Sequence, residues 1–150
     1  MTLKLAFEVY AKIRKPVAEV FDAVYNPKKL SGYFTTGEAS GPLDEGKTVM
    51  WNFHDYPGAF PVYVKQVIMN QKIVFEWDSN EGTKNRVEMK FEPINKDSTI
   101  VKISESGWKN EDQKSLDASY GNCYGWMNML CCLKVYLEYD KNLRVFLLII

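Results

Sequence analysis

The sequence predicts an α+β fold: an antiparallel sheet of about six to seven strands, two short helices after the first strand, and one long closing helix. Most of the 150 residues fall into short runs in which apolar and polar side chains alternate, and short turns join these runs in succession. Strands connected in this way pair antiparallel. The last run leads into one helical segment at about residues 115–138. For this length we expect one domain over residues 1–150.

The first strand and the helix pair are predicted near the amino terminus. Every second residue over 3–13 is apolar, which is the period of a half-buried antiparallel strand. Pro16 ends this strand and suits the first position of a helix, which we expect over residues 16–25 from its apolar stripe. A short second helix at 27–30 follows the break at Asn26.

Further strand-like runs, separated by turn residues, fill the middle of the chain. Turns are expected at 55–58, 80–82 and 95–97, where Gly, Pro, Asn and Asp gather. The longest run changes its apolar face near Lys65, which predicts a bulge or bend. We place these strands at about 48–53, 60–69, 73–77, 87–92 and 99–105.

The closing helix is predicted to cover the sheet, because its apolar residues recur at three- and four-residue spacing. Tyr120, Tyr124 and Met127 suit an adaptable, partly wet wall over an incompletely filled groove. A solidly packed core helix explains most of the same residues, so both interpretations stay open at this point. The predicted stripe consists of Leu116, Tyr120, Cys123, Met127, Leu130, Lys134 and Leu137, with Trp126 and Leu133 beside it.

Composition and charge argue against several function classes. The 19 basic and 19 acidic residues give zero formal net charge without blocks of like charge, so we expect no nucleic-acid partner. No run approaches the about 20 apolar residues of a membrane helix, and the first residues alternate too early for a signal peptide. The odd number of cysteines, all in the closing helix, favours reduced thiols and a cytoplasmic location. The apolar tail 145–150 is suited to pairing with a sheet edge or a second subunit, so a homodimer is considered.

Several segments match, in order, the helices, strands and turns of a known superfamily: residues 15–24, 26–30, 73–77, 98–101, 105–108, 125–130, 133–138 and 142–144. By these segments the chain resembles the SRPBCC superfamily, also called START-like or birch-pollen-allergen-like. It is most similar to the branch related to the C-terminal domain of the heat-shock-protein-ninety ATPase activator. The resemblance implies a helix-grip fold, in which a curved sheet wraps around the long helix and leaves a cavity. Residues 32–36 depart from the tryptophan-rich pattern common in that branch.

Groups able to carry chemistry are few. His54, the only histidine, precedes a turn and is expected to be a solvated loop residue rather than a catalytic base. Cys131 and Cys132 point about 100° apart on a helix, which favours structural thiols over a zinc site. The glycines follow no strand-to-helix junction that could cradle a phosphate. We therefore predict no metal and no cofactor.

Glu105 is the polar residue of greatest interest. By alternation it shares a face with Val101 and Ile103, the face that should look at the closing helix. A carboxylate there is costly unless it is paired or lies near a cavity mouth. Either it reaches water or Lys109 at the strand end, or it anchors a ligand or transfers a proton.

The leading hypothesis is a non-catalytic protein that binds a small hydrophobic molecule, such as a lipid, in an aromatic-lined cavity between sheet and helix. One alternative is a polyketide cyclase or hydrolase-like enzyme that uses Glu105, Tyr120 or His54 as acid or base. Another is a cochaperone-like module that binds a protein through the outer face of the sheet, which rests on the resemblance alone. The predicted ligand-binding residues are Trp51, Phe53, Phe75, Trp77, Met89, Phe91, Glu105, Tyr120, Tyr124 and Met127.

Overall fold

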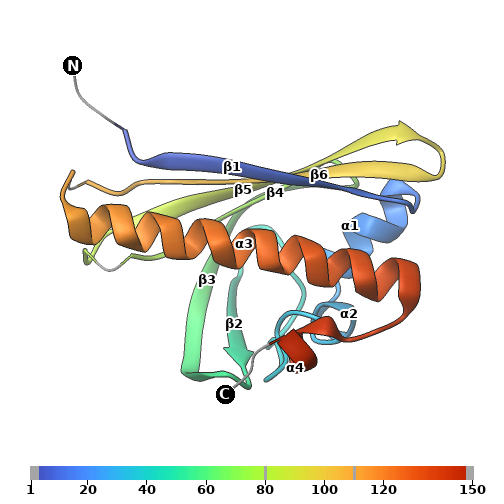
Figure 1. Ribbon diagram of the computed structural model, residues 1–150, viewed down its shortest axis with the longest axis horizontal. Coiled ribbons are helices and arrows are strands. Elements are labelled where there is room, and N and C mark those ends of the chain that lie inside the picture. The colour runs from blue at the N-terminus through green and yellow to red at the C-terminus, as the bar shows by residue number, and fades with distance from the viewer. Residues whose placement is uncertain (1–3, 80, 110, 148–150) are drawn as a thin grey trace.

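The computed structural model describes residues 4–79, 81–109 and 111–147 (Figure 1). These residues form a six-stranded antiparallel sheet, two short helices after the first strand, and a long helix followed by a short one, which confirms the α+β class. In chain order the elements are β1 (Ala6–Ile13), α1 (Val17–Tyr25), α2 (Pro27–Leu30), β2 (Thr48–Phe53), β3 (Tyr56–Ile68), β4 (Lys72–Asp78), β5 (Lys84–Asn95), β6 (Ser98–Ser106), α3 (Gln113–Tyr139) and α4 (Leu143–Leu147).

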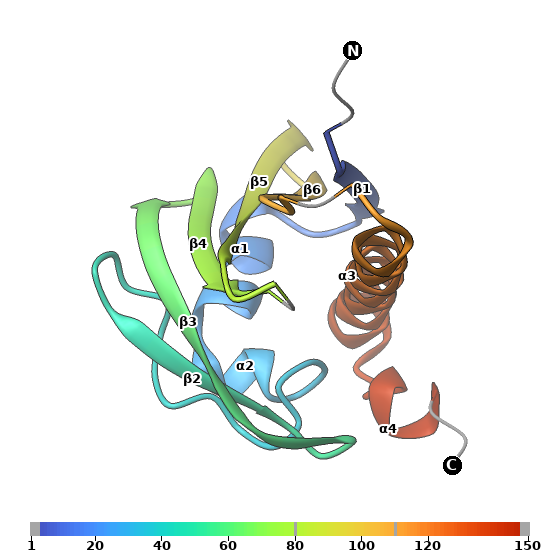
Figure 2. The ribbon, with the colours of Figure 1, turned by 90° about the vertical axis from the view of Figure 1, so that its left-hand side faces the viewer.

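The sheet has the strand order β1-β6-β5-β4-β3-β2, and every neighbouring pair is antiparallel. Strands β2 to β5 each pair with the next strand in the chain, whereas β1 pairs with the last strand, β6. Figure 2 looks nearly along α3 and shows the sheet curving from β1, beside the helix, round to β2. Helices α1 and α2 lie on the concave side, together with α3. The arrangement is the one that the helix-grip resemblance implies.

Most element boundaries agree with the sequence prediction, and the exceptions have local causes. The predicted bulge is confirmed, because the pairing register of β3 shifts between Val64 and Gln66. β3 begins at Tyr56, so the predicted turn at 55–58 is mostly strand, since a tighter turn already joins β2 to β3. Pro16 lies at the N-cap of α1, one residue before the predicted position. Helix α4 was not predicted.

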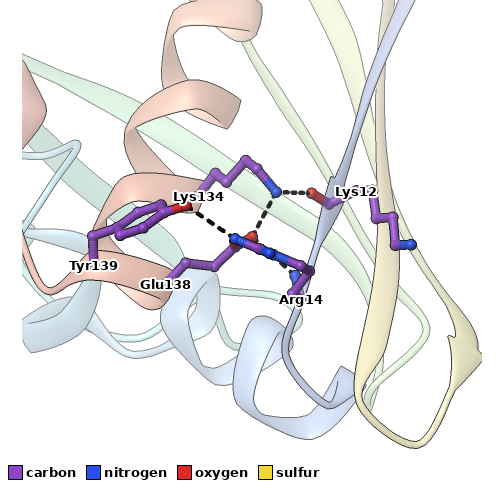
Figure 3. Close-up of polar contacts among 5 residues, drawn as sticks. All are labelled: Lys12, Arg14, Lys134, Glu138 and Tyr139. Carbon is purple, nitrogen blue, oxygen red and sulfur yellow. Dashed lines mark hydrogen bonds and ion pairs between the residues drawn. The ribbon is translucent and has the colours of Figure 1, made fainter.

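The two ends of α3 are held by side-chain hydrogen bonds. At the start, the Asp112 carboxylate accepts a bond from the Ser115 backbone N–H at 2.9 Å, which makes Asp112 the N-cap. At the end, the 4% exposed Glu138 carboxylate accepts bonds from the Arg14 backbone N–H at 3.0 Å, Arg14 Nε at 2.6 Å and Lys134 Nζ at 2.6 Å (Figure 3). Burial by itself raises the pKa of Glu138, but these donors lower it to about 2. The last turns of α3 are thereby tied to the end of β1.

The predicted face of α3 is confirmed at Trp126, Leu130 and Leu133, which are buried, but the first half of the helix turns a different face to the sheet. Tyr120, Tyr124 and Met127 point outward, with 61%, 67% and 38% of their surfaces exposed. The first half of the inner face of α3 meets Glu105 and the aromatic rings of the sheet. Small and polar side chains occupy this part of the face, so the pattern of apolar residues in the sequence does not reveal it. The buried residues of α3 are Ser115, Ser119, Trp126, Met129, Leu130, Cys132 and Leu133.

Side chains from the concave face of the sheet fill most of the space under α3. Four predicted wall residues, Trp51, Phe75, Met89 and Phe91, are buried within this core. The Phe75 ring lies between its neighbours, with its centre 5.3 Å from that of Trp51 and 6.1 Å from that of Trp126. The protein's own side chains therefore close the deep part of the predicted cavity.

Candidate functional site

A pocket of about 430 Å³ lies between α3 and the half of the sheet formed by β2, β3 and β4. This volume falls in the range of about 300–1,000 Å³ that small-molecule sites occupy. The sheet strands supply one side, α3 the facing side, and α4 a third. The lining residues, most of them aromatic or without a polar side chain, are Phe34, Phe53, Tyr56, Phe60, Pro61, Trp77, Asp78, Gly121, Asn122, Gly125, Trp126 and Arg144.

Two stacked indoles form one wall of the pocket. The ring centres of Trp77 on β4 and Trp126 on α3 are 5.2 Å apart, and their planes are inclined by 29°. Both indole nitrogens donate to the carboxylate of Glu105, Trp77 Nε1 at 3.1 Å and Trp126 Nε1 at 2.8 Å. Because one acceptor fixes both rings, the sheet side and the helix side of this wall are held in a set orientation.

Glu105 lies on β6 behind this wall and is 1% exposed. Its Oε2 also accepts hydrogen bonds from Asn85 Nδ2 and Asn122 Nδ2, both at 2.8 Å. All four donors are neutral, and together they satisfy a carboxylate that burial would otherwise leave unpaired. The predicted orientation of Glu105 toward the helix is confirmed. Of the two alternatives for its role, contact with water or Lys109 at the strand end does not agree with its burial and its four donors. The Lys109 backbone N–H donates to Glu81 instead, at 2.8 Å. Glu105 is not a lining residue, so we regard it as a positioning residue for the wall.

The adjoining wall consists of phenyl rings and one cation, and its Phe60 ring meets the Trp77 ring with centres 5.8 Å apart. Phe53 and Phe60, on the β2–β3 hairpin, stack with ring centres 5.5 Å apart and planes inclined by 26°. The Arg144 guanidinium, on α4, lies 4.5 Å from the centre of the Phe53 ring, within cation–π distance. It also donates two hydrogen bonds to Asp55, at 2.8 Å and 3.1 Å. Because Asp55 is only 3% exposed in its side chain, this is a buried, paired charge that adds no net charge to the pocket.

Two glycines of α3, Gly121 and Gly125, complete the helix side of the pocket. They are one turn apart, and a Cβ atom added to either would have no neighbour within 4 Å. Glycine in a helix interior costs about 1 kcal/mol relative to alanine. The helix thus carries two unfavourable residues where the structure has room for a side chain.

The structure brings part of the predicted ligand site together. Phe53 and Trp77 line the pocket, Glu105 supports it from behind, and the other predicted residues lie in the closed core or on the outer face of α3. Two signals in the sequence could have improved the prediction. Gly121 and Gly125 share one helical face, and Trp126 follows directly. The lining residues that the sequence analysis missed are Phe34, Tyr56, Phe60, Pro61, Asp78, Gly121, Asn122, Gly125, Trp126 and Arg144.

The groups considered for other chemistry lie apart from the pocket lining. His54 is exposed, as expected, and its Nδ1 is hydrogen-bonded to the Thr36 hydroxyl. Tyr120 points outward, and Glu105 is occupied by its four donors. Burial raises the pKa of the Cys132 thiol to about 11, which makes it a poor nucleophile. Within the described part of the chain, no group of three or more His, Cys, Asp or Glu side chains could hold a metal ion. No described helix is long and apolar enough to span a membrane.

Comparison with known proteins identifies a family and a shared fold. The family model for "Activator of Hsp90 ATPase homolog 1-like protein" matches residues 14–138. No protein of curated function matches the chain. A crystal structure of a Staphylococcus saprophyticus protein is 28% identical, with a TM-score of 0.74, over 91% of this chain and 95% of that one. These matches confirm the helix-grip fold.

Two more distant structures share that fold. DynU16, described as a putative protein in the dynemicin biosynthetic locus, is 22% identical with a TM-score of 0.78, over 93% of this chain and 49% of that one. The Aha1 dimer of Colwellia psychrerythraea is 18% identical with a TM-score of 0.74, over 91% of this chain and 98% of that one.

Proposed function

This chain belongs to the family of Activator of Hsp90 ATPase homolog 1-like proteins, and we propose that it binds a small, mostly apolar molecule in the pocket beside α3. The observation that carries the proposal is a hollow of about 430 Å³ whose aromatic walls are held by a buried carboxylate. Burial of apolar ligand surface contributes about 25 cal/mol per Å² before ordering costs are subtracted. Walls that are already fixed reduce those ordering costs.

The polar groups of the lining favour an uncharged ligand with one oxygen acceptor. An arginine carries five N–H donors, and Asp55 engages two of those on Arg144. Within the described residues only Asp55 accepts hydrogen bonds from Arg144, so its remaining donors can serve a carbonyl or hydroxyl oxygen of a ligand. A ligand carboxylate gains less here, because Asp55 already neutralises the guanidinium.

Thermal shift and tryptophan fluorescence test the proposal together. We expect members of a panel of fatty alcohols and uncharged aromatic polyketides to raise the melting temperature and to quench the tryptophan emission. Trp77→Phe should reduce the quenching, because Trp77 lines the pocket. The matched control is Trp108→Phe, since Trp108 packs on Phe7 at 6.1 Å between ring centres, outside the lining. If no panel member stabilises or quenches the wild type, the proposal fails.

The family description supports a second candidate, a module that acts on an Hsp90-type ATPase. The outer face of the sheet, to which the sequence analysis assigned such a role, carries ion pairs such as Lys72 with Glu88 at 3.1 Å. The outward side chains of Tyr120, Tyr124 and Met127 offer a better apolar contact surface. The test is the ATPase rate of a purified Hsp90, measured with the wild type and with the double variant Tyr120→Ser, Tyr124→Ser. An unchanged rate with the wild type contradicts this candidate.

A further inference from the structure

Gly121 and Gly125 differ from glycines that the fold requires. Neither has a positive φ, in contrast to Gly107 at +120°, so no special backbone conformation explains them. Close packing does not explain them either, because a Cβ at either position would meet nothing within 4 Å. At Gly32, by comparison, a Cβ would lie 2.7 Å from the Tyr136 ring. What the two helix glycines share is that both line the pocket.

Aromatic rings line the pocket together with these glycines. Trp77 and Trp126 stack on one side, and Phe53 and Phe60 stack on another. Without side chains at two positions one turn apart, α3 presents its backbone to the same space. Aromatic rings pair well when they are offset-stacked or edge-to-face, with ring centres about 4.5–7 Å apart, and any ring against the helix gains dispersion energy when its carbon atoms come within about 3.5–4.0 Å of the backbone. Alanine methyl groups would stand in this space and hold a flat molecule away from the helix.

We infer that Gly121 and Gly125 are the specificity determinants of the pocket, and that they admit a planar aromatic ligand against the backbone of α3. This inference rests on the proposed function, since it names the class of ligand. Both alanine variants are tolerated by the fold, because the added methyl groups meet open space and alanine favours the helix. Each alanine variant should therefore be more stable than the wild type but bind a planar aromatic ligand more weakly.

The experiment compares two alcohols of different shape with the full chain. The planar probe is 9-anthracenemethanol and the globular probe is 1-adamantanemethanol, and their dissociation constants are measured by tryptophan fluorescence and calorimetry. We expect the wild type to prefer the planar probe at least fivefold. Gly121→Ala and Gly125→Ala should each weaken the planar probe at least fivefold, change the globular probe less than twofold, and raise the melting temperature by about 2–4 °C.

The control is Cys131→Ala, which also places alanine on α3 but at an exposed position outside the lining. It should leave both dissociation constants unchanged. If the wild type binds the probes and the two glycine variants bind both probes as tightly as the wild type does, the inference is overturned while the proposed function stands. A wild type that prefers the globular probe also overturns the inference. If the wild type binds neither probe nor any member of the earlier panel, the proposed function itself fails.

Discussion

Replacing Glu105 by glutamine should destabilise the protein far more than loss of one charge at the surface. In the wild type, Oε2 accepts three hydrogen bonds and Oε1 accepts the bond from Trp126. A glutamine amide has one oxygen, which can take over the three bonds at the Oε2 position. Its NH₂ group then faces the Trp126 N–H, so that this buried donor loses its acceptor.

The magnitude follows from the number of bonds affected. One orphaned buried donor costs about 1–3 kcal/mol, and each bond that passes from a charged to a neutral acceptor loses about 1 kcal/mol. Relief of the carboxylate's desolvation offsets part of this sum. We therefore expect Glu105→Gln to lower the free energy of unfolding by about 2–4 kcal/mol and the melting temperature by roughly 5–15 °C.

Urea unfolding followed by tryptophan fluorescence measures the change. The matched control is Glu92→Gln on the neighbouring strand, because Glu92 is half exposed and pairs with Lys102 across the solvent face. Its effect should stay within about 0.5 kcal/mol. Near-ultraviolet circular dichroism should also change for Glu105→Gln, since the stacked indoles lose part of their common anchor. Equal urea midpoints for both variants and the wild type would refute the role assigned to Glu105.

Three further predictions concern other parts of the fold. The pKa of Glu138 is about 2 when folded and 4.5 ordinarily, so its stabilisation is complete above about pH 4.5 and is lost as the pH falls toward 2. The difference in unfolding free energy between wild type and Glu138→Gln should shrink over that interval, and a constant difference contradicts the assignment. Gly107→Ala should cost more than Gly82→Ala in urea unfolding, because only the former puts a Cβ 3.0 Å from backbone atoms, and equal costs contradict this. Arg144→Met should cost at least about 2 kcal/mol by leaving Asp55 buried and unpaired. Adding Asp55→Asn should recover part of that loss, and a double variant no more stable than the single one argues against the ion pair.

The sheet could be predicted from the sequence because alternation is a strong local signal. In β6 the inward face carries Val101, Ile103 and Glu105, and the structure buries all three. The same rule located the bulge in β3 from a change of apolar face. These features depend only on residues that are close together in the chain, so they can be predicted from one sequence.

The inner face of α3 could not be read in the same way. Its first half buries Ser115 and Ser119, while tyrosines point outward, so an apolar stripe leads to the wrong face. These small and polar residues face inward because the helix meets a buried carboxylate there, and that carboxylate belongs to a strand. The pocket wall at Arg144 depends on Asp55, 89 positions earlier, a pairing that no local pattern contains.

Arg144 lies beyond residues 14–138, the part of the chain that the family model matches. Yet its guanidinium covers Phe53 and closes one side of the pocket. α4 is held against the pocket by this ion pair and these ring contacts. It is not part of the backbone hydrogen bonding between strands that holds the sheet together. A change in the short stretch after Glu138 would therefore reshape this pocket, while the architecture common to the family stays intact.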